Sequence, residues 1–482
     1  MSNVTEMQVS DTFTSTVTPG ASVAHFTVDE RAARGKAARA EVPRASHADW
    51  QATAARPDPV ALLENQATTR LANLVPIRYG RMLVSPFAFY RGAANIMASD
   101  LSGMPRTGLH VQLCGDAHLA NFGVFAAPDR RLVFDTNDFD ETLPGPFEWD
   151  LRRLATSFAV AGRERGYDAG KRREISCMVS RAYREAMAKL AEERNLDIWY
   201  TRTDVDEMVS TWSSKLSAKA VKRTEQNLAK ARMKDSLAAF AKLTRLVNGE
   251  PQIISNPPLI VPVRDLATGD QTLGTLQAVM RSYRRTLTGD RRHLLEQFRF
   301  VDAALKVVGV GSVGTRSWIA LFMGRDNDDP LFLQVKEAQA SVLEPFLGKS
   351  RFASHGQRVV EGQRLMQAAS DTMLGWIGVE GLDGVKREFY VRQLWDAKGS
   401  AIVEAMAPKT MAAYASVCGR ALARGHARSG DSVAIASYLG ASDVFDTALA
   451  TFAETYADQN QRDYDALAAA ARSGRIVVQR GV

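Results

Sequence analysis

Residues 114–142, CGDAHLANFGVFAAPDRRLVFDTNDFDET, contain two apolar runs separated by a short polar turn. The runs NFGVFAA and LVFDT flank residues 129–131, which is the pattern of a β-hairpin. Polar side chains are concentrated around the ends of this predicted hairpin: Asp116, His118, Asn121, Asp135, Asp138 and Asp140. A turn needs only one aspartate or asparagine. The cluster therefore indicates a functional site.

The side chains of this cluster favour a hard cation such as Mg²⁺, which binds one or two carboxylates together with phosphates and waters. A binuclear metallophosphoesterase would need more histidines, and an EF-hand loop would need a glycine at a position where this stretch has an aspartate. A phosphoryl-transfer centre needs an aspartate that orients the acceptor, then an asparagine and a second aspartate for metal. Asp116, Asn121 and Asp138 occur in that order. Asp135 and Asp140 compete with Asp138 for the metal role.

A second motif is the glycine-rich run GVGSVG at residues 309–314. It leads into TRSWIALFMG, a β-branched and aromatic run that predicts a strand and not the helix of a dinucleotide-binding fold. A glycine-rich turn between two strands lets backbone N–H groups approach the phosphates of a nucleotide. The candidate phosphate-binding residues in this turn are Gly309, Gly311, Ser312 and Gly314.

The strand-like run LFLQVKEA places Lys336 downstream of the glycine-rich turn. A lysine in this place is suited to bind the α- and β-phosphates of a nucleotide. A helix is predicted to follow, and a glutamate from that helix should hold the lysine. We expect Glu361 in RVVEGQRLM to have this role, with Glu344 as the alternative.

The pattern of the whole chain predicts an α+β protein with two lobes. Residues 1–55 are expected to form a mobile tail, and residues 56–299 the first part of a large helical lobe that includes the catalytic hairpin. Five strand-like runs predict a small β-rich lobe over residues 300–395. Helical spacing returns over residues 396–482, which should complete the large lobe.

The composition is that of an ordinary globular protein, with 45% hydrophobic and 24% charged residues in a chain of 482. No apolar run is long enough for a spanning helix, and the first residues lack a secretory leader pattern. The three cysteines, at positions 114, 177 and 418, are too few and too far apart for a disulfide framework. We therefore expect a cytoplasmic protein that does not bind membranes.

Basic residues exceed acidic ones, which gives a net charge of +7. Many of them lie in residues 215–245, where apolar residues at helical spacing indicate the solvated face of a helix pair; binding of nucleic acid or another polyanion is the alternative. Arg91, in SPFAFYRG, also has two interpretations. Its guanidinium either binds an anionic group or forms a structural ion pair with a carboxylate.

These motifs resemble the protein-kinase-like fold, and particularly its aminoglycoside and choline kinase branch. The phrase CGDAHLAN resembles the catalytic loop of that branch, and the phrase beginning at Asp138 resembles its metal-binding loop. The order is reversed, because Asp116 precedes Lys336 in this chain. The resemblance implies a circularly permuted kinase-like fold that binds ATP and Mg²⁺, a rearrangement that is possible when the chain ends lie close together.

A closer resemblance extends from about residue 30 to the end of the chain. The segments SPFAFYRG, LCGDAHLANFG, NDFDETLPGPFEWDLRRLA, VVGVGSVGTR, HGQRVVEGQRLMQAASD and YADQNQRDY are similar to the bacterial family known as domain of unknown function 2252. That family brings no established reaction, so the expected chemistry rests on the residues themselves.

The sequence thus predicts an ATP- and Mg²⁺-dependent phosphotransferase with an unidentified small-molecule or protein acceptor. Asp116 and His118 are the candidate catalytic residues, and Asn121, Asp138 and Asp135 are the candidate metal ligands. Three alternatives remain open: a pseudokinase-like nucleotide-binding scaffold, a nucleotidyl transferase on the same fold, and a polyanion-binding protein.

Overall fold

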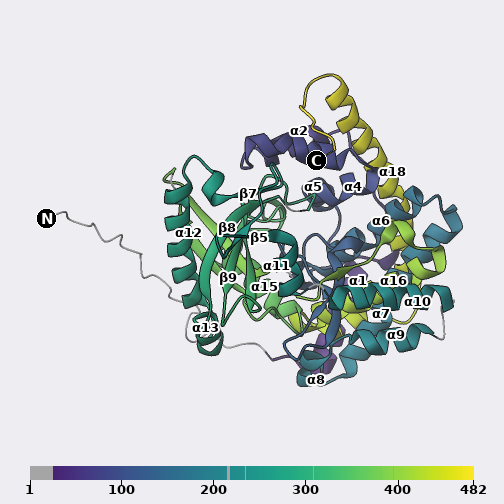
Figure 1. Ribbon diagram of the computed structural model, residues 1–482. Coiled ribbons are helices and arrows are strands. Elements are labelled where there is room, and N and C mark those ends of the chain that lie inside the picture. Colours follow the sequence, from purple (N-terminus) through teal and green to yellow (C-terminus); the bar gives the residue numbers. More distant parts are fainter. Residues whose placement is uncertain are drawn as a thin grey trace.

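The computed structural model describes residues 25–213, 218–233, 235–307, 309–381, 383–394 and 396–481, with the side chains of residues 211–213, 220 and 270 left aside. Within these residues the protein is α+β. A β-sheet with helices α12 (Gly269–Tyr283) and α13 (Gly289–Leu295) beside it lies on one side of Figure 1, and a body of long helices lies on the other. The predicted fold class is thereby confirmed at the level of α+β.

In the described part of the chain, the main sheet has six antiparallel strands in the order β11-β12-β10-β9-β8-β7. Four of the five runs predicted after residue 300 coincide with β9, β10, β11 and β12, whereas the first run begins at Lys306, the last residue of β8. In chain order the strands are β7 (Ile260–Pro262), β8 (Arg299–Lys306), β9 (Ser317–Met323), β10 (Pro330–Ala338), β11 (Gly375–Glu380) and β12 (Lys386–Gln393).

Both faces of this sheet are covered by residues that precede β8. Alternate side chains of a strand point to opposite faces, so Ile319 and Leu321 of β9 pack with α11 (Ser236–Leu243) and with β6 (Glu250–Ile253), whereas Ala320 and Phe322 pack with α12 and α13. The predicted lobe boundary at residue 300 therefore falls inside the sheet-containing part. The strands β5 (Thr244–Val247) and β6 (Glu250–Ile253) form a separate hairpin.

The helical body is built on α6 (Phe147–Glu164), α7 (Ala169–Glu192), α16 (Pro408–Ser429), α17 (Ser432–Leu439) and α18 (Val444–Arg472). The helices α7 and α16 approach closely at Gly419, where a Cβ atom would lie 2.4 Å from the backbone oxygen of Val179. Glycine is therefore required at this crossing. The end of α18 packs against helices from the N-terminal part of the chain, near the C-terminus in Figure 1.

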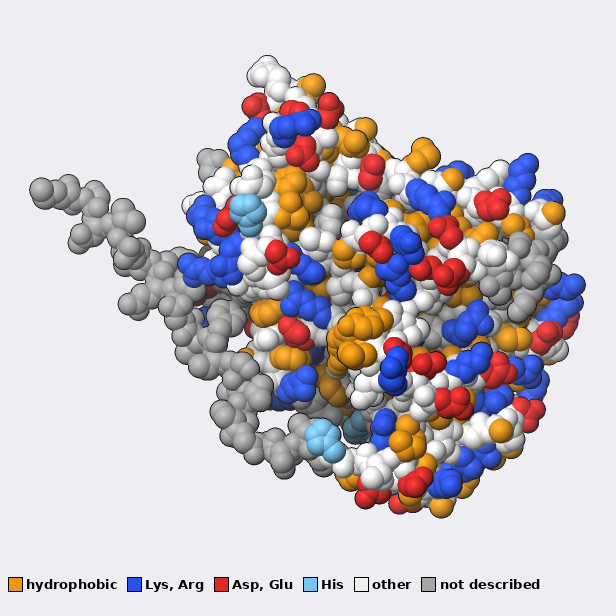
Figure 2. All heavy atoms as spheres, turned by 90° about the horizontal axis from the view of Figure 1, so that it is seen from below, with side chains coloured by type: hydrophobic (Ala, Val, Ile, Leu, Met, Phe, Trp, Pro, Cys, Tyr) orange, Lys and Arg blue, Asp and Glu red, His pale blue; other side chains and the backbone are white. Residues whose placement is uncertain are grey.

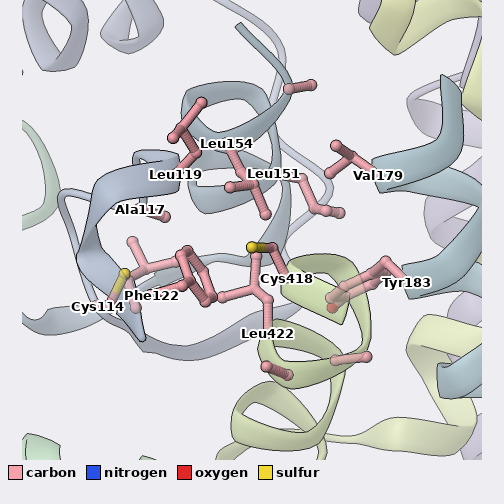
Figure 3. Packing of buried hydrophobic residues seen from close by; sticks show 14 of the residues in the cluster. Cys114, Ala117, Leu119, Phe122, Leu151, Leu154, Val179, Tyr183, Cys418 and Leu422 are labelled. Atoms are coloured by element: carbon pink, nitrogen blue, oxygen red, sulfur yellow. The ribbon is translucent and has the colours of Figure 1, made fainter. Parts of the chain in front are cut away.

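The predicted hairpin consists of β2 (Phe122–Ala126) and β3 (Leu132–Thr136), with the short strand β13 (Gly399–Ser400) on the other side of β2. The strand β1 (His110–Leu113) pairs with β4 (Leu143–Pro146). Figure 3 shows Leu119 and Phe122 packed with Leu154 of α6 and with Cys418 and Leu422 of α16. The main hydrophobic core of the helical body therefore lies directly under the hairpin.

The N-terminal part of the chain is folded from residue 28 onward. Helix α1 (Val28–Glu41) begins with a capping box formed by Thr27 and Glu30, and its Arg31 forms an ion pair of 2.7 Å with Asp431 at the start of α17. A 3₁₀ helix, η1 (Arg44–Ala48), follows. The folded body thus begins well before residue 56, and the rest of the predicted tail, residues 1–24, lies outside the described residues.

The remaining helices connect these parts, and no helix in the described ranges is long and apolar enough to cross a membrane. On the face shown in Figure 2, basic and acidic side chains are intermingled. The connecting helices are α2 (Pro59–Ala67), η2 (Ala72–Leu74), α3 (Val75–Met82), α4 (Pro86–Gly92), α5 (Ala94–Ser102), η3 (Leu119–Asn121), α8 (Asn195–Tyr200), α9 (Val205–Ser213), α10 (Ala218–Arg232), η4 (Val263–Asp265), η5 (Arg284–Thr286), α14 (Glu344–Leu347), α15 (His355–Met366) and η6 (Val403–Ala405).

The core under the hairpin gives the first testable prediction. Leu422 is fully buried there, so Leu422→Ala should lower the free energy of unfolding by about 2–5 kcal/mol. Leu196 is 65% exposed, so Leu196→Ala should change it by less than about 0.5 kcal/mol. Urea unfolding followed by circular dichroism measures both variants. Equal effects of the two substitutions would contradict the assignment of this core.

Candidate functional site

A cavity of about 800 Å³ lies between the loop before the hairpin, the glycine-rich turn of the sheet and the helices α2 and α4. The structure brings most of the predicted site residues to this one cavity. Those that line it are Asp116, His118, Asn121, Asp138, Gly309, Gly311 and Ser312. The cavity therefore joins the two motifs that the sequence separates by almost 200 residues.

The loop 114–121 is held in place by the first turns of α6. The carboxylate of Asp150 accepts hydrogen bonds from the backbone N–H groups of Cys114 (2.8 Å) and Gly115 (3.1 Å), and His426 lies 3.3 Å from the same carboxylate. Gly115 has a φ of +86°, and a Cβ atom there would lie 2.2 Å from the backbone oxygen of Glu141. Only glycine fits this position. Asp150 fixes the backbone on which Asp116 stands.

Asp116 lies in the cavity with a cation on one side and an imidazole on the other. Its Oδ1 accepts a hydrogen bond of 2.7 Å from Nε of Arg153, and its Oδ2 lies 3.8 Å from Nε2 of His118. Burial raises the pKa of Asp116, and Arg153 opposes that rise. Arg153 is itself fixed, because it donates to the backbone oxygen of Tyr90 (2.7 Å) and stacks over the ring of Tyr90. The carboxylate is therefore held in one orientation.

His118 is a neutral imidazole in this environment. Burial lowers its pKa well below the usual value, and the positive charges of Arg91 and Arg153 lower it further. Its Nδ1 atom is buried and has no hydrogen-bond partner in the described part of the chain. A neutral ring beside Asp116 can exchange a proton or a hydrogen bond with a bound molecule.

Asn121 and Asp138 have oxygen atoms suited to a divalent cation. Asn121 donates from Nδ2 to the backbone oxygen of Asp116 (2.8 Å), so its side-chain oxygen is the atom that a metal would use. Burial raises the pKa of Asp138, and the neighbouring carboxylate of Asp140 raises it further. A cation here would offset that repulsion. In the described ranges, no three or more His, Cys, Asp or Glu side chains are grouped so that they could bind a metal ion by themselves. The set fits Mg²⁺, which needs only one or two carboxylates and takes other ligands from phosphates and water.

Lys336, on β10, forms its ion pair with Asp140. Its Nζ lies 2.5 Å from Oδ2 of Asp140, while the hydroxyl of Tyr390 on β12 donates to Oδ1 at 2.7 Å. Ser312 of the glycine-rich turn lies 3.2 Å from Oδ2. Despite burial, the charge of Lys336 lowers the pKa of Asp140, and Asp140 raises the pKa of Lys336. Both groups are therefore charged.

The two glutamates predicted to hold Lys336 lie elsewhere. Glu361 on α15 pairs with Arg364 at 3.3 Å, one turn along the same helix. Glu344 lies beside His355 (3.7 Å) and Arg358 (4.0 Å). The structure assigns the role of lysine partner to Asp140, a residue from the polar cluster.

Asp135 does not line the cavity among the described residues. It lies on β3, is almost fully buried, and forms an ion pair with Arg424 of α16. Burial raises its pKa, and Arg424 opposes that rise. The side chain therefore joins β3 to α16. Of the three aspartates that competed for the metal role, Asp138 and Asp140 line the cavity, and Asp140 is occupied by Lys336.

The glycine-rich turn is held over the cavity by the segment between α2 and α3 and by α3 itself. Gly309 and Gly314 have φ values of +59° and +90°, which favour glycine. Arg81 donates to the backbone oxygen of Gly309 (2.7 Å), and the N–H of Leu71 donates to that of Gly314 (2.8 Å). Arg70 donates to the backbone oxygen of Val313 (2.5 Å). The turn is therefore tied to the helical body.

Two further residues that line the cavity are Arg91, for which the sequence left two interpretations open, and Glu141, which was given no role from the sequence. Arg91 lies near the carboxylates of Asp116, Glu404 and Asp138, yet within the described residues it forms no ion pair, and its buried Nε has no hydrogen-bond partner there. Of its two interpretations, the structure favours an anion-binding cation.

Glu141 accepts a hydrogen bond of 2.7 Å from the N–H of Val342, and burial raises its pKa to about 7. In the sequence, only the position of Glu141 within the acidic run NDFDET pointed to a place in the site.

The site is thus a polar cavity between a sheet and a helical body in an α+β protein. The model of a protein family described as uncharacterized protein conserved in bacteria (DUF2252) matches residues 70–470. The chain belongs to this family, as its motifs predicted. Comparisons with curated proteins and with solved structures found no match.

Glu141 gives a prediction about pH. Its pKa is raised from 4.5 to about 7 in the folded protein, so folding favours its protonated form. The contribution of Glu141 to the free energy of unfolding is therefore largest below pH 4.5, and it is lost as the pH rises to 7. Glutamine does not ionise, so Glu141→Gln avoids this loss. The free energy of unfolding of the variant minus that of wild type should therefore increase by up to about 3 kcal/mol between pH 4.5 and pH 7.5. Urea titrations at several pH values measure this difference, and a difference independent of pH would contradict the assignment.

Proposed function

We propose that the protein is an ATP- and Mg²⁺-dependent phosphotransferase that acts on a hydroxyl acceptor. The observation that carries this proposal is the shared cavity: Asp116, Asn121 and Asp138 line it opposite the glycine-rich turn. Lys336 lies behind them, joined to the cavity through Asp140. These are the residue types that phosphoryl transfer needs, in one place.

The arrangement of the sheet supports the kinase-like interpretation. The glycine-rich turn connects β8 to β9, and the lysine lies on β10, the next strand. The helix α15 follows, and then the strands β11 and β12. A glycine-rich turn, a lysine on the strand after the next turn and a following helix is the order of these parts in protein kinases. The catalytic-type loop precedes them in this chain, which corresponds to a circular permutation.

Each residue of the site would have its own role in phosphoryl transfer. Bound Mg²⁺, held by the side-chain oxygen of Asn121 and by Asp138, would neutralise charge on the phosphates. Asp116 orients the acceptor hydroxyl and accepts its proton, because its carboxylate is fixed by Arg153. The backbone of the glycine-rich turn would bind phosphate oxygens, and Lys336, which is paired with Asp140 behind the cavity, would place a positive charge beside them. The result is catalysis by positioning and charge stabilisation.

Nucleotide binding gives a direct test that needs no knowledge of the acceptor. Isothermal titration calorimetry with ATP should show binding that depends on Mg²⁺, and Asp138→Asn and Lys336→Met should weaken it by at least about tenfold, as expected for lost charged contacts. Lys306→Met is the matched control, since Lys306 lies on β8 of the same sheet but, unlike Lys336, forms no ion pair with a described residue of the cavity. Equal loss in all three variants, or no ATP binding to folded wild type, would refute the proposal.

Turnover separates catalysis from binding. Asp116→Asn should bind ATP within about threefold of wild type, while slow transfer of the phosphoryl group to water should fall by about 10²–10⁴, the usual effect of losing a general base. Chromatography of the nucleotide products measures this. ADP as product supports phosphoryl transfer, and AMP would indicate nucleotidyl transfer. ATP binding without turnover in wild type would favour the scaffold alternative, and full activity in Asp116→Asn would refute the assignment of the base.

A further inference from the structure

A second cavity, of about 960 Å³, lies on another side of the hairpin. It is bordered by β2 and β3, by α9 and α10, and by residues 399–410, which lead from β13 into α16. Its described lining residues include none of those that line the first cavity. Its volume falls in the range of about 300–1,000 Å³ that is typical of small-molecule sites.

The inner wall of this cavity is apolar. Val124, Phe134, Met208, Leu228 and Tyr414 line it, and each is less than a tenth exposed. They come from β2, β3, α9, α10 and α16, so the wall is built by five elements of the fold. A surface of this kind favours the hydrocarbon part of a ligand.

The charged residues around this cavity all have the same sign. Lys171, Lys219, Arg223 and Lys409 line it, and the described lining residues include no aspartate or glutamate. Lys171 is paired with Asp168 (2.7 Å). Lys219 and Lys409 form no ion pair within the described part of the chain. Positive charge is therefore left without an anion at the edge of an apolar wall.

The cavity also borders the residues that hold the catalytic-type loop. The hydroxyl of Tyr414 donates to the backbone oxygens of Leu119 (2.8 Å) and Phe122 (3.0 Å), on either side of Asn121. The strand β13 pairs with β2 at Gly399 and Val124, and both of these residues line the second cavity. A ligand in the second cavity would therefore touch the support of the first.

We infer that the second cavity binds an amphipathic organic anion, namely a long-chain carboxylate of the fatty-acid class. The apolar wall takes the hydrocarbon chain, and the lysines and arginine at the edge take the carboxylate. A neutral lipid would leave the cations unpaired, and a hydrophilic polyanion would leave the exposed apolar part of the lining, such as Ile402, in water. This inference is independent of the proposed phosphotransferase activity, because it concerns other residues and binding in the absence of nucleotide.

The binding test uses cis-parinaric acid, a fluorescent polyunsaturated fatty acid, and the full-length protein. The fluorescence of the probe should rise and then saturate when one probe molecule is bound per protein chain. Hexadecanoate should displace the probe at least about tenfold more effectively than dodecanoate, because each methylene group removed weakens apolar binding by about fourfold. Displacement that does not depend on chain length, or equally strong displacement by inorganic phosphate, would overturn the inference, as would the absence of saturable binding.

Matched variants of α10 test the location. The double variant Lys219→Gln with Arg223→Gln removes two charges from the cavity edge. It should lower the affinity for the probe by about fivefold, as expected for the loss of two exposed charges. Lys222→Gln with Lys230→Gln removes two charges from the same helix outside the lining and should leave binding within twofold. Equal effects of the two pairs would overturn the location. These side chains are exposed, and circular dichroism shows whether each variant is folded.

Ala405→Trp tests the cavity itself, because the added ring would fill space beside Ala405 on the wall opposite α10. Binding of the probe should be lost in the folded variant, while Mg²⁺-dependent ATP binding at the first cavity should remain. Unchanged probe binding in this variant would overturn the inference. If wild type binds the probe but no ATP, the proposed function fails and the fatty-acid site stands.

Discussion

The buried ion pair between Lys336 and Asp140 is the interaction on which the geometry of the site depends. Lys336 comes from the middle of the sheet and Asp140 from the segment after the hairpin, so the pair joins the sheet to the helical body. Removing one partner of such a pair costs about 3–5 kcal/mol, because it leaves a buried charge without compensation. The segment next to Asp140 makes further connections. Arg358 of α15 donates to the backbone oxygens of Asp140 (2.9 Å) and Thr142 (2.7 Å), and Ser341 donates to that of Glu141 (2.8 Å). Residues 140–142 therefore fix how the sheet sits over the cavity.

The sequence predicted those features that depend on local pattern. The hairpin, the four strands after the glycine-rich turn, that turn itself and the position of Lys336 on a strand all follow from short-range periodicity and turn chemistry. The partner of Lys336 does not, since it depends on which of several carboxylates the tertiary structure brings close, and Glu361 pairs with Arg364 in its own helix instead. Asp135 and Asp138 are three residues apart, but β3 directs Asp135 toward Arg424 while Asp138 reaches the cavity. The covering of the sheet by residues 236–299 also depends on long-range packing.

The site combines a concentration of negative charge with a small number of fixed cations. Asp116, Asp138 and Asp140 are half-buried near one another, and Arg153 and Lys336 compensate two of them. Asp138 is left without such a partner within the described residues, and Arg91 faces it without an ion pair of its own. A metal–phosphate complex would supply both missing charges, a cation for Asp138 and an anion for Arg91. This charge complementarity, together with the glycine-rich turn, is the physical basis of the proposed function in a family without an established reaction.

The most direct test of this account is a crystal structure with Mn²⁺ and a non-hydrolysable ATP analogue, in which anomalous scattering locates the metal. The account predicts a peak within ligand distance of the side-chain oxygens of Asn121 and Asp138, as the oxygen-ligand chemistry of this type of ion requires, and phosphate density between the glycine-rich turn and Asp116. An ordered nucleotide in another part of the molecule, or a metal bound away from Asn121 and Asp138, would contradict it.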